Sequence, residues 1–508
     1  MHRRLRRTCP GASERWIVSS DGLEYIVFLR QDVLWQDGEP FSAADVIYTM
    51  SPLRSPDFPG DAELGAFWRT VETEQLGDYL IRFRLAQPLG NFLDRLQIGI
   101  LPEHALRGTT AAQIAGHPFN LTPIGTGPYQ LEALRAADGT TVDEVDLRAA
   151  PVYRQRPEGQ QHAFALDRVT FRLYDTADAA VNALESGAVD GYAARDRSER
   201  TPLFNAANAY DLAMHNAREA TLGVIIYNWA KDDFFREQRV RTALETGIDR
   251  TSTIQRTLAN SADEANSPLM PGSWAYLPDL QWPAYNPDQA RQLLETASER
   301  LDRLNADDAT EAPTEVGSAL FTFSILTPDD PALVNLTNEI ATQWSQLNLQ
   351  VTVEAVDTDT YRTRLQSHDF DAALVEYSLG GSADPDVYAF WHEGQYPDGK
   401  NYGGVTDTRI SQLLEKARQD PFGINRVQMY QDFQREFVAR AVALPLYYPL
   451  FTFVTSPNVQ GVQLGFIASP ADRFRNIGDW CDKTGLRTEV RGLSKLYLAP
   501  FFSQSSVL

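Results

Sequence analysis

The clearest hydrophobic pattern in this chain switches between the spacings of strands and helices. Residues 320–326, 349–353 and 372–377 are β-prone runs with apolar positions at strand spacing. Between these runs, apolar residues recur at helical spacing: Leu333, Leu336, Ile340, Leu347, Tyr361 and Leu365. The resulting β-α-β-α-β order predicts a parallel sheet with right-handed crossovers. Ligands of such sheets lie beyond the carboxyl ends of the strands.

The region before residue 100 shows a second pattern of strands and one capped helix. Residues 25–29 and 79–85 form runs with strand periodicity, the second with one largely polar face. Ser42 and Asp45 have the spacing of a capping box, in which each side chain bonds the other residue's backbone. We therefore expect a helix to follow Ser42.

Two further helices are predicted in the middle of the chain. Residues 166–192 have the order strand, helix, strand, with Asp175 and Asp178 as the expected helix cap and Gly187 at the turn that ends the helix. Apolar residues at helical spacing predict another helix over residues 234–247. These segments indicate α/β units along much of the chain.

Length and composition are those of a soluble globular protein with several domains. The chain has 508 residues, enough for two or three domains of ~100–200 residues each. The net charge of −22 repels a phosphate backbone, so nucleic acid is not expected as a partner. Cys9 and Cys481 are the two cysteines and lie near opposite ends, which indicates neither a disulfide framework nor a cysteine metal site.

The sequence shows no recognisable export signal or membrane-spanning segment. Residues 1–16 are basic but lack a following apolar stretch of ~7–15 residues, as an export signal requires. No segment reaches the ~18 uninterrupted apolar residues of a membrane helix.

Motifs for catalysis, cofactors or metals are also missing from the sequence. The seven histidines include no pair at the spacing of a helical zinc site, so we expect hydrogen-bonded or solvated side chains and no cofactor. The segment 125–128, Gly-Thr-Gly-Pro, lacks the third glycine of a phosphate loop, and its proline has no N–H donor. Carboxylates are numerous, but spacing cannot show two of them converging, so a glycoside hydrolase stays a remote alternative.

Aromatic and amide side chains recur in segments that we predict to be loops. The candidates for ligand contact are Tyr227, Asn228, Trp229, Tyr377, Trp391 and Tyr402. Such residues suit a cleft that stacks and hydrogen-bonds a ligand without transforming it. Ordinary core packing explains any one of them equally well, and both interpretations stay open.

An ordered set of motifs resembles one protein family. The segment WIVSSDGLEYIVFLRQDVLWQDGEPFSAADVIYTM is similar to the signature of the bacterial extracellular solute-binding proteins of family 5, which bind peptides or nickel for ABC transporters. Further matches follow in the family's order: LPEHAL, PIGTGPYQLEAL, ALESGAVDGY, REQRVRTALETGIDRTSTI, YNPDQARQLLETA, SHDFDAALVEYSLGGSADPDVYAFW and KNYGGVTDTRISQLLEKA. Together the matches cover residues 13–480, and their shared order makes coincidence improbable.

The resemblance implies an α/β fold of the periplasmic-binding-protein type with two lobes and an extra domain, known as cluster C. The bounds that it implies are a partial extra domain over 13–119, lobe I over 120–223 and 452–485, lobe II over 229–448, hinge strands 224–228 and 446–451, and a tail over 486–508. Family members carry an export signal and the first strands of lobe I ahead of the signature. We therefore expect that this chain is truncated at its N-terminus or begins at a wrongly assigned start.

The resemblance also bears on the ligand. Peptide-binding relatives place an aspartate before an Asp-Pro pair, where it binds the peptide's amino terminus, with an aromatic residue three positions earlier. Aligned on Asp384, these positions hold Gly381 and Ser378, which argues against the usual amino-terminal anchor because a buried ammonium needs a carboxylate. Asp384 or Glu376 is a possible substitute, although we expect Asp384 to cap the next helix.

Function follows from the resemblance as an expectation. The chain is expected to be a monomeric, non-enzymatic component of an ABC importer. We expect its lobes to close on a solute and the closed form to dock on permease subunits with their ATPases. The expected location is the periplasm or the outer face of the cytoplasmic membrane. A peptide is the leading solute. An oligosaccharide stacked on Trp229 and Trp391, a metal chelate near His392, and a ligand sensor remain alternatives.

Overall fold

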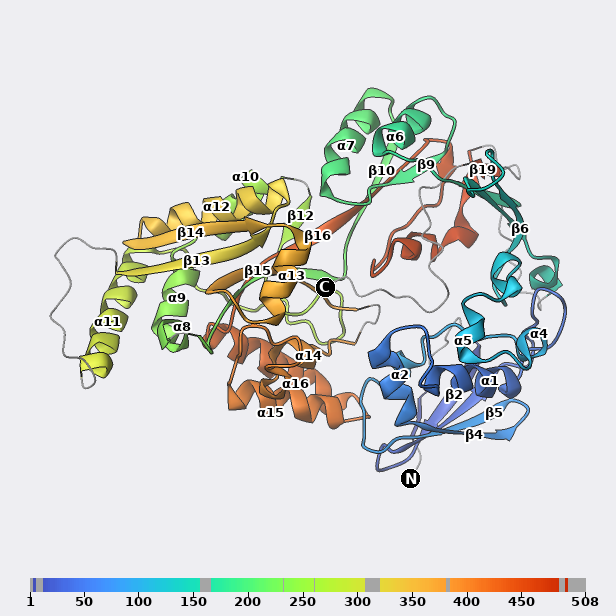
Figure 1. Cartoon of the computed structure of the whole chain (residues 1–508), viewed down its shortest axis with the longest axis horizontal. Coiled ribbons are helices and arrows are strands. Elements are labelled where there is room, and N and C mark those ends of the chain that lie inside the picture. The colour runs from blue at the N-terminus through green and yellow to red at the C-terminus, as the bar shows by residue number, and fades with distance from the viewer. Residues whose placement is uncertain are drawn as a thin grey trace. The chain divides into compact units, whose positions relative to one another are not determined.

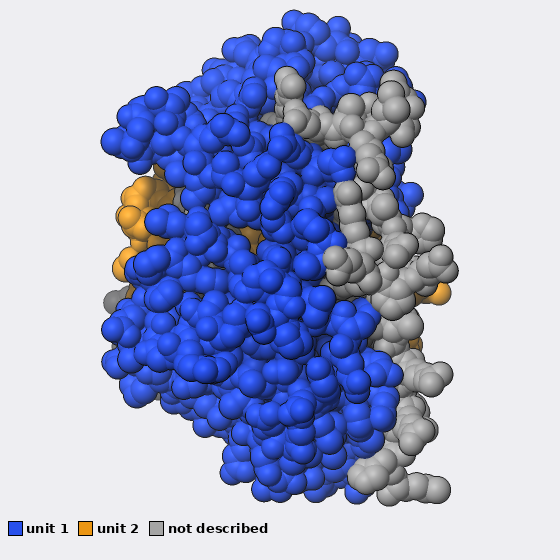
Figure 2. Space-filling model, turned by 90° about the vertical axis from the view of Figure 1, so that its right-hand side faces the viewer, with its two compact units in different colours: residues 1–217, 451–465, 470–507 blue, residues 218–450, 466–469, 508 orange. Residues whose placement is uncertain are grey.

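The computed structural model divides into two compact units, coloured separately in Figure 2. The residues that the structure describes are 3–5, 12–155, 166–231, 233–259, 261–306, 320–380, 384–483 and 489–491. Unit 1 comprises residues 1–217, 451–465 and 470–507, and unit 2 comprises residues 218–450, 466–469 and 508. The lobe and hinge bounds given above remain predictions.

Unit 1 begins with an antiparallel sheet of five strands in the order β1-β2-β3-β5-β4. Of these strands, β2, β4 and β5 are labelled in Figure 1. Its strands are β1 (Arg3–Leu5), β2 (Ser13–Val18), β3 (Glu24–Leu29), β4 (Glu72–Gly77) and β5 (Leu80–Arg84). The helices of this region are α1 (Ala43–Arg54), α2 (Ala62–Arg69), α3 (Phe92–Arg95), α4 (Glu103–Leu106) and α5 (Ala111–Ile114), followed by the 3-10 helix η1 (Pro118–Leu121). The two predicted strands and the Ser42–Asp45 capping box at the start of α1 are confirmed.

A second sheet of unit 1 has the order β19-β8-β7-β6. Its strands are β6 (Tyr129–Arg135), β7 (Glu144–Ala149), β8 (Arg168–Arg172) and β19 (Glu489–Arg491), with β19 parallel to β8. The other elements of the unit are η2 (Pro151–Gln155), α6 (Ala177–Glu185), β9 (Gly191–Ala193), η3 (Arg197–Glu199), α7 (Arg200–Ala209), β10 (Ala213–Arg218), β17 (Val459–Gln460), η5 (Pro470–Phe474), η6 (Ile477–Asp479) and β18 (Cys481–Asp482).

The predicted strand-helix-strand order near residue 170 is confirmed as β8, α6 and β9, but the predicted helix cap is wrong. Thr176, not Asp175, is the N-cap of α6, and its hydroxyl accepts a hydrogen bond from the Ala179 N–H at 3.2 Å. The capping position therefore lies one residue later than the sequence pattern indicated.

Unit 2 is built on a mixed sheet in which β16, β11, β15, β13 and β14 lie in that order. The strands are β11 (Thr221–Tyr227), β12 (Ala262–Glu264), β13 (Phe321–Pro328), β14 (Leu349–Val356), β15 (Ala372–Ser378) and β16 (Leu444–Thr455). Residues 451–455 of β16 belong to unit 1. β13 runs parallel to both β14 and β15, which confirms the predicted parallel unit. β11 is antiparallel to β15 and β16, and β12 pairs with β16.

The helices of unit 2 are α8 (Asp233–Arg236), α9 (Gln238–Thr246), α10 (Arg250–Thr257), α11 (Pro287–Ala306), α12 (Pro331–Ser345), α13 (Thr358–Gln366), α14 (Tyr388–Trp391), η4 (Glu393–Gln395), α15 (Thr408–Gln419) and α16 (Ile424–Ala439). The helix predicted over 234–247 is two helices, because Glu237 leaves helical geometry and accepts from the Arg239 N–H as the N-cap of α9. Trp344 of α12 is fully buried and donates to the Leu244 carbonyl at 2.9 Å, which ties α12 to α9.

Candidate functional site

Asn228, the first residue after β11, uses all of its amide hydrogen-bonding capacity within unit 2. Its Nδ2 donates to the carbonyls of His368 and Phe370 at 3.0 and 2.9 Å. Its Oδ1 accepts from the N–H groups of Ala230 and Lys231, both at 3.1 Å. The side chain is buried and links residues 228–231 to residues 368–370, so it stabilises the end of the sheet.

Tyr227 and Trp229, on either side of Asn228, belong to the core of unit 2. Their exposed fractions are 1% and 6%. The Tyr227 ring stacks on Phe235 with centroids 5.5 Å apart, and the Arg241 guanidinium lies 3.7 Å from the Trp229 ring centre. Burial raises the pKa of Tyr227 well above its ordinary value, so its hydroxyl stays neutral.

The structure brings Tyr377, Trp391 and Tyr402 together in one aromatic cluster. Tyr377 lies 4.3 Å from Phe390, 5.5 Å from Trp391 and 6.3 Å from Tyr402 between ring centroids. The Tyr377 hydroxyl donates to the Lys400 carbonyl at 3.1 Å. All three candidate residues are buried, so their rings pack against protein within unit 2. Contact of any of them with a ligand remains a prediction.

The segment after β15 holds the remaining candidates. Ser378 is the exposed last residue of β15, and Gly381 lies outside the described residues. Asp384 forms a two-point ion pair with Arg426 of α16, at 2.7 and 2.8 Å, and each side chain is only 5% exposed. Burial lowers the pKa of Arg426, but the hydrogen bonds with Asp384 outweigh this effect, so the pKa is raised overall.

The expectation that Asp384 caps the next helix is wrong. α14 begins at Tyr388, and the Tyr388 N–H bonds to Asp386 Oδ1 at 3.1 Å. Asp384 instead pairs with Arg426, 42 residues further along the chain. Its carboxylate is therefore committed to anchoring this segment onto α16.

Three residues form a row across the sheet that no sequence motif predicted. Gly223 of β11 lies opposite both Glu376 of β15 and Tyr447 of β16. A Cβ on Gly223 would stand 2.3 Å from the Tyr447 ring, so only glycine lets this ring lie across β11. The Tyr447 hydroxyl then donates to Glu376 Oε1 at 2.9 Å. The row fixes the partly exposed Glu376 carboxylate on the central strands.

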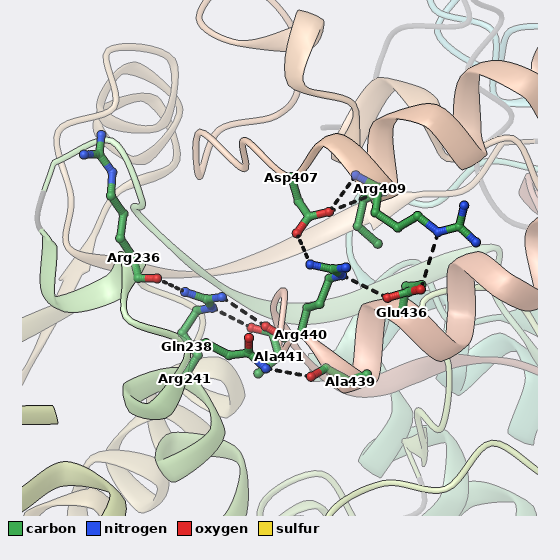
Figure 3. A network of polar contacts seen from close by, with 10 residues as sticks. Arg236, Gln238, Arg241, Asp407, Arg409, Glu436, Ala439, Arg440 and Ala441 are labelled. Atoms are coloured by element: carbon green, nitrogen blue, oxygen red, sulfur yellow. Dashed lines mark hydrogen bonds and ion pairs between the residues drawn. The ribbon is translucent and has the colours of Figure 1, made fainter. Parts of the chain in front are cut away.

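A polar network joins the ends of α9, α15 and α16 (Figure 3). Arg241 is 3% exposed and donates to the Ala441 and Arg440 carbonyls at 2.8 and 3.0 Å. These carbonyls follow the C-terminus of α16, where backbone acceptors lack helical partners. Arg440 in turn bonds to Asp407, the N-cap of α15, at 3.0 Å. This network stabilises the packing of α16, the helix that carries Arg426, against α9 and α15.

Metal ligands and membrane helices are not found in the part of the chain that the structure describes. There, no three His, Cys, Asp or Glu side chains gather in a way that would hold a metal ion. His392 stacks on Tyr388 at 4.1 Å, and its Nδ1 accepts from the Gly394 N–H at 3.0 Å. Within the same residues, no helix is both long and apolar enough to cross a membrane.

Solved structures share the fold of this chain. AppA from Bacillus subtilis, in complex with a nonapeptide, superposes with a TM-score of 0.63 at 24% identity and covers 93% of this chain and 90% of AppA. NikZ from Campylobacter jejuni, in complex with Ni(L-His), gives a TM-score of 0.67 at 24% identity and covers 95% and 93%. The predicted α/β fold of the two-lobe binding-protein type is confirmed.

Sequence comparison identifies the family. The chain is 27% identical over 479 residues to the oligopeptide-binding protein AppA of Bacillus subtilis, which covers 90% of this chain and 81% of AppA. The family model described as "Bacterial extracellular solute-binding proteins, family 5 Middle" matches residues 9–398. This match spans well over half of the chain, and so the protein belongs to the bacterial extracellular solute-binding proteins of family 5.

Proposed function

We propose that the protein captures a peptide-like solute outside the cytoplasmic membrane and delivers it, unchanged, to the permease of an ABC importer. The observation that carries this proposal is the family match over residues 9–398. Membership of a family of solute-binding proteins supports a binding role rather than catalysis. The lobes would close on the solute, and the closed form would dock on the permease.

The name of AppA, an oligopeptide-binding protein, supports a peptide as the solute class. The geometry of unit 2 adds a condition on how a peptide is held. Asp384 already neutralises Arg426, and a second cation there would have to break a buried ion pair. We therefore propose that the peptide's amino terminus is not bound by Asp384 and that main-chain contacts give most of the affinity.

Glu376 is the carboxylate that we propose for a cationic side chain of the solute. It stands at the end of β15, beside the exposed Ser378, and the Tyr447 hydroxyl fixes its orientation at 2.9 Å. The buried candidates Tyr227, Trp391 and Tyr402 would then support the site through core packing and would not contact the solute.

Native mass spectrometry and thermal-shift measurements test this proposal. The panel contains peptides of two to nine residues, the same peptides N-acetylated, oligosaccharides and Ni(L-His). We expect a shift that grows with peptide concentration, because a ligand of the folded state stabilises by mass action. Acetylation should change the dissociation constant by less than about threefold. Binding of only sugars or only Ni(L-His) would contradict the peptide assignment, and a product in the peptide mixture would contradict the non-enzymatic role.

A further inference from the structure

Arg473 is a buried cation of unit 1 that has few polar partners among the described residues. It lies in the short 3-10 helix η5, and its side chain is 4% exposed. Its guanidinium carbon is 4.3 Å from the ring centre of Phe474 and 5.8 Å from that of Phe453 in β16. Trp480 closes the cluster, with its ring centroid 5.8 Å from Phe453 and 5.6 Å from Phe474.

The Arg473 guanidinium has an N–H group without a hydrogen-bond acceptor. One terminal nitrogen donates to the Pro470 carbonyl, whereas the Nε–H is buried and has no acceptor. The neighbouring carboxylate of Asp472 bonds to Arg475 instead, at 2.9 and 3.0 Å. Among the described residues, no carboxylate forms an ion pair with Arg473. Buried arginines are normally paired, so this arrangement is unusual.

The charge of Arg473 and its unsatisfied Nε–H determine which ligand could bind beside it. Burial lowers the pKa of Arg473 to about 10, so the group remains a cation at neutral pH. The two aromatic faces offset part of the desolvation, but they do not provide an acceptor for the Nε–H. An acceptor at the Nε–H would complete its hydrogen bonding, and an anion there would also compensate the buried charge. Because the residue is only 4% exposed and its Nε–H is buried, the space beside it suits a small species only.

We propose that unit 1 binds a small inorganic anion, of the size of chloride, against the Nε–H of Arg473 and the edge of the Phe453–Phe474–Trp480 cluster. The anion would supply the charge and the acceptor that the guanidinium lacks. It would bind the folded protein only, since Arg473 is not enclosed in the unfolded chain, and would thereby stabilise unit 1. This proposal does not depend on the solute's identity.

Thermal unfolding in sodium chloride and in sodium gluconate at equal ionic strength tests the site. The proteins are the wild type, the variant Arg473→Met, and Arg475→Met as a matched control two residues away. For the wild type, chloride at ten times its dissociation constant should lower the unfolding equilibrium constant about elevenfold relative to gluconate. Arg475→Met should keep this chloride effect, and Arg473→Met should lose it.

Three results would overturn the site. They are an equal effect of the two salts on the wild type, a chloride effect that survives in Arg473→Met, and loss of the effect in Arg475→Met. Crystals of the wild type soaked in sodium bromide give an independent answer, which holds even where Arg473→Met does not fold. An anomalous bromide peak within hydrogen-bond distance of Arg473 Nε is expected, and its absence at saturating bromide would refute the proposal.

Discussion

Arg426 in unit 2 and Arg473 in unit 1 are equally buried, with 4% of each residue exposed. Arg426 lies on a long helix and meets Asp384 with two hydrogen bonds, while its Nε donates to the Ala417 carbonyl at 2.8 Å. Arg473 has two aromatic rings and one carbonyl around it. Burial disfavours the charge in both places, but only in unit 2 does a carboxylate reverse that effect on the pKa.

Arg241 shows that carbonyl groups alone can satisfy a buried guanidinium. It donates to four backbone carbonyls, those of Phe235, Arg236, Arg440 and Ala441. Burial nevertheless lowers its pKa to about 10, because neutral acceptors compensate desolvation less than a carboxylate does. A buried guanidinium therefore has two separate requirements, hydrogen-bond acceptors for its N–H groups and compensation of its charge. Arg426 meets both, Arg241 meets the first, and Arg473 meets neither.

The largest expected effect is the loss of the unit 2 ion pair. Arg426→Met leaves the Asp384 carboxylate buried without its cation, and we expect the free energy of unfolding to fall by about 3–5 kcal/mol. Denaturant unfolding measures this change. The double variant Asp384→Asn/Arg426→Met should recover much of the loss, since it removes both charges. A double variant as unstable as Arg426→Met would show that packing, not the ion pair, stabilises the segment.

The same substitution in unit 1 should have the opposite sign in a buffer without small inorganic anions. Arg473→Met removes a buried cation that has no carboxylate partner, and we expect the free energy of unfolding to rise by about 1–3 kcal/mol at pH 7.5. Denaturant unfolding in gluconate measures it. A loss of several kcal/mol, like that of Arg426→Met, would mean that the aromatic contacts compensate Arg473 fully.

Alkaline pH should sharpen this contrast further. The folded-state pKa of Arg473, about 10, lies below that of the unfolded chain, so above pH 10 the unfolded state binds more protons. The stability of the wild type relative to Arg473→Met should therefore rise by about 1.4 kcal/mol per pH unit above pH 10. Comparing these two proteins cancels the titration of Arg241 and the tyrosines. A flat difference between pH 9 and 11.5 would contradict the lowered pKa of Arg473.

The smallest effects are expected from two ion pairs whose arginine side chains are 51% and 52% exposed, which serve as references. Asp432→Asn removes the pair with Arg435, whose side chain is 51% exposed, and Arg475→Met removes the pair with Asp472. Each should change the free energy of unfolding by less than about 1 kcal/mol, because solvent screens such pairs. A larger change in denaturant unfolding at either position would show that charge alone, without burial, controls stability here.

Features that depend on a few neighbouring residues could be predicted from the sequence. The Ser42–Asp45 capping box and the three strands of the β13, β14 and β15 unit follow from local hydrogen bonding and apolar periodicity, and both are confirmed. Two local features differ from the prediction. Thr176 rather than Asp175 caps α6, a difference of one residue, and Glu237 divides the predicted helix into two.

Only the tertiary structure decided the partners of the buried polar groups. Asp384 had the local signs of a helix cap but pairs with Arg426 at a distance of 42 residues, and Tyr447 reaches Glu376 because Gly223 lies between them. Arg473 has no local sign of its isolation either. The physical reason is that caps and periodicity are decided within about one helical turn, whereas the partner of a buried charge depends on which distant segments the fold brings together.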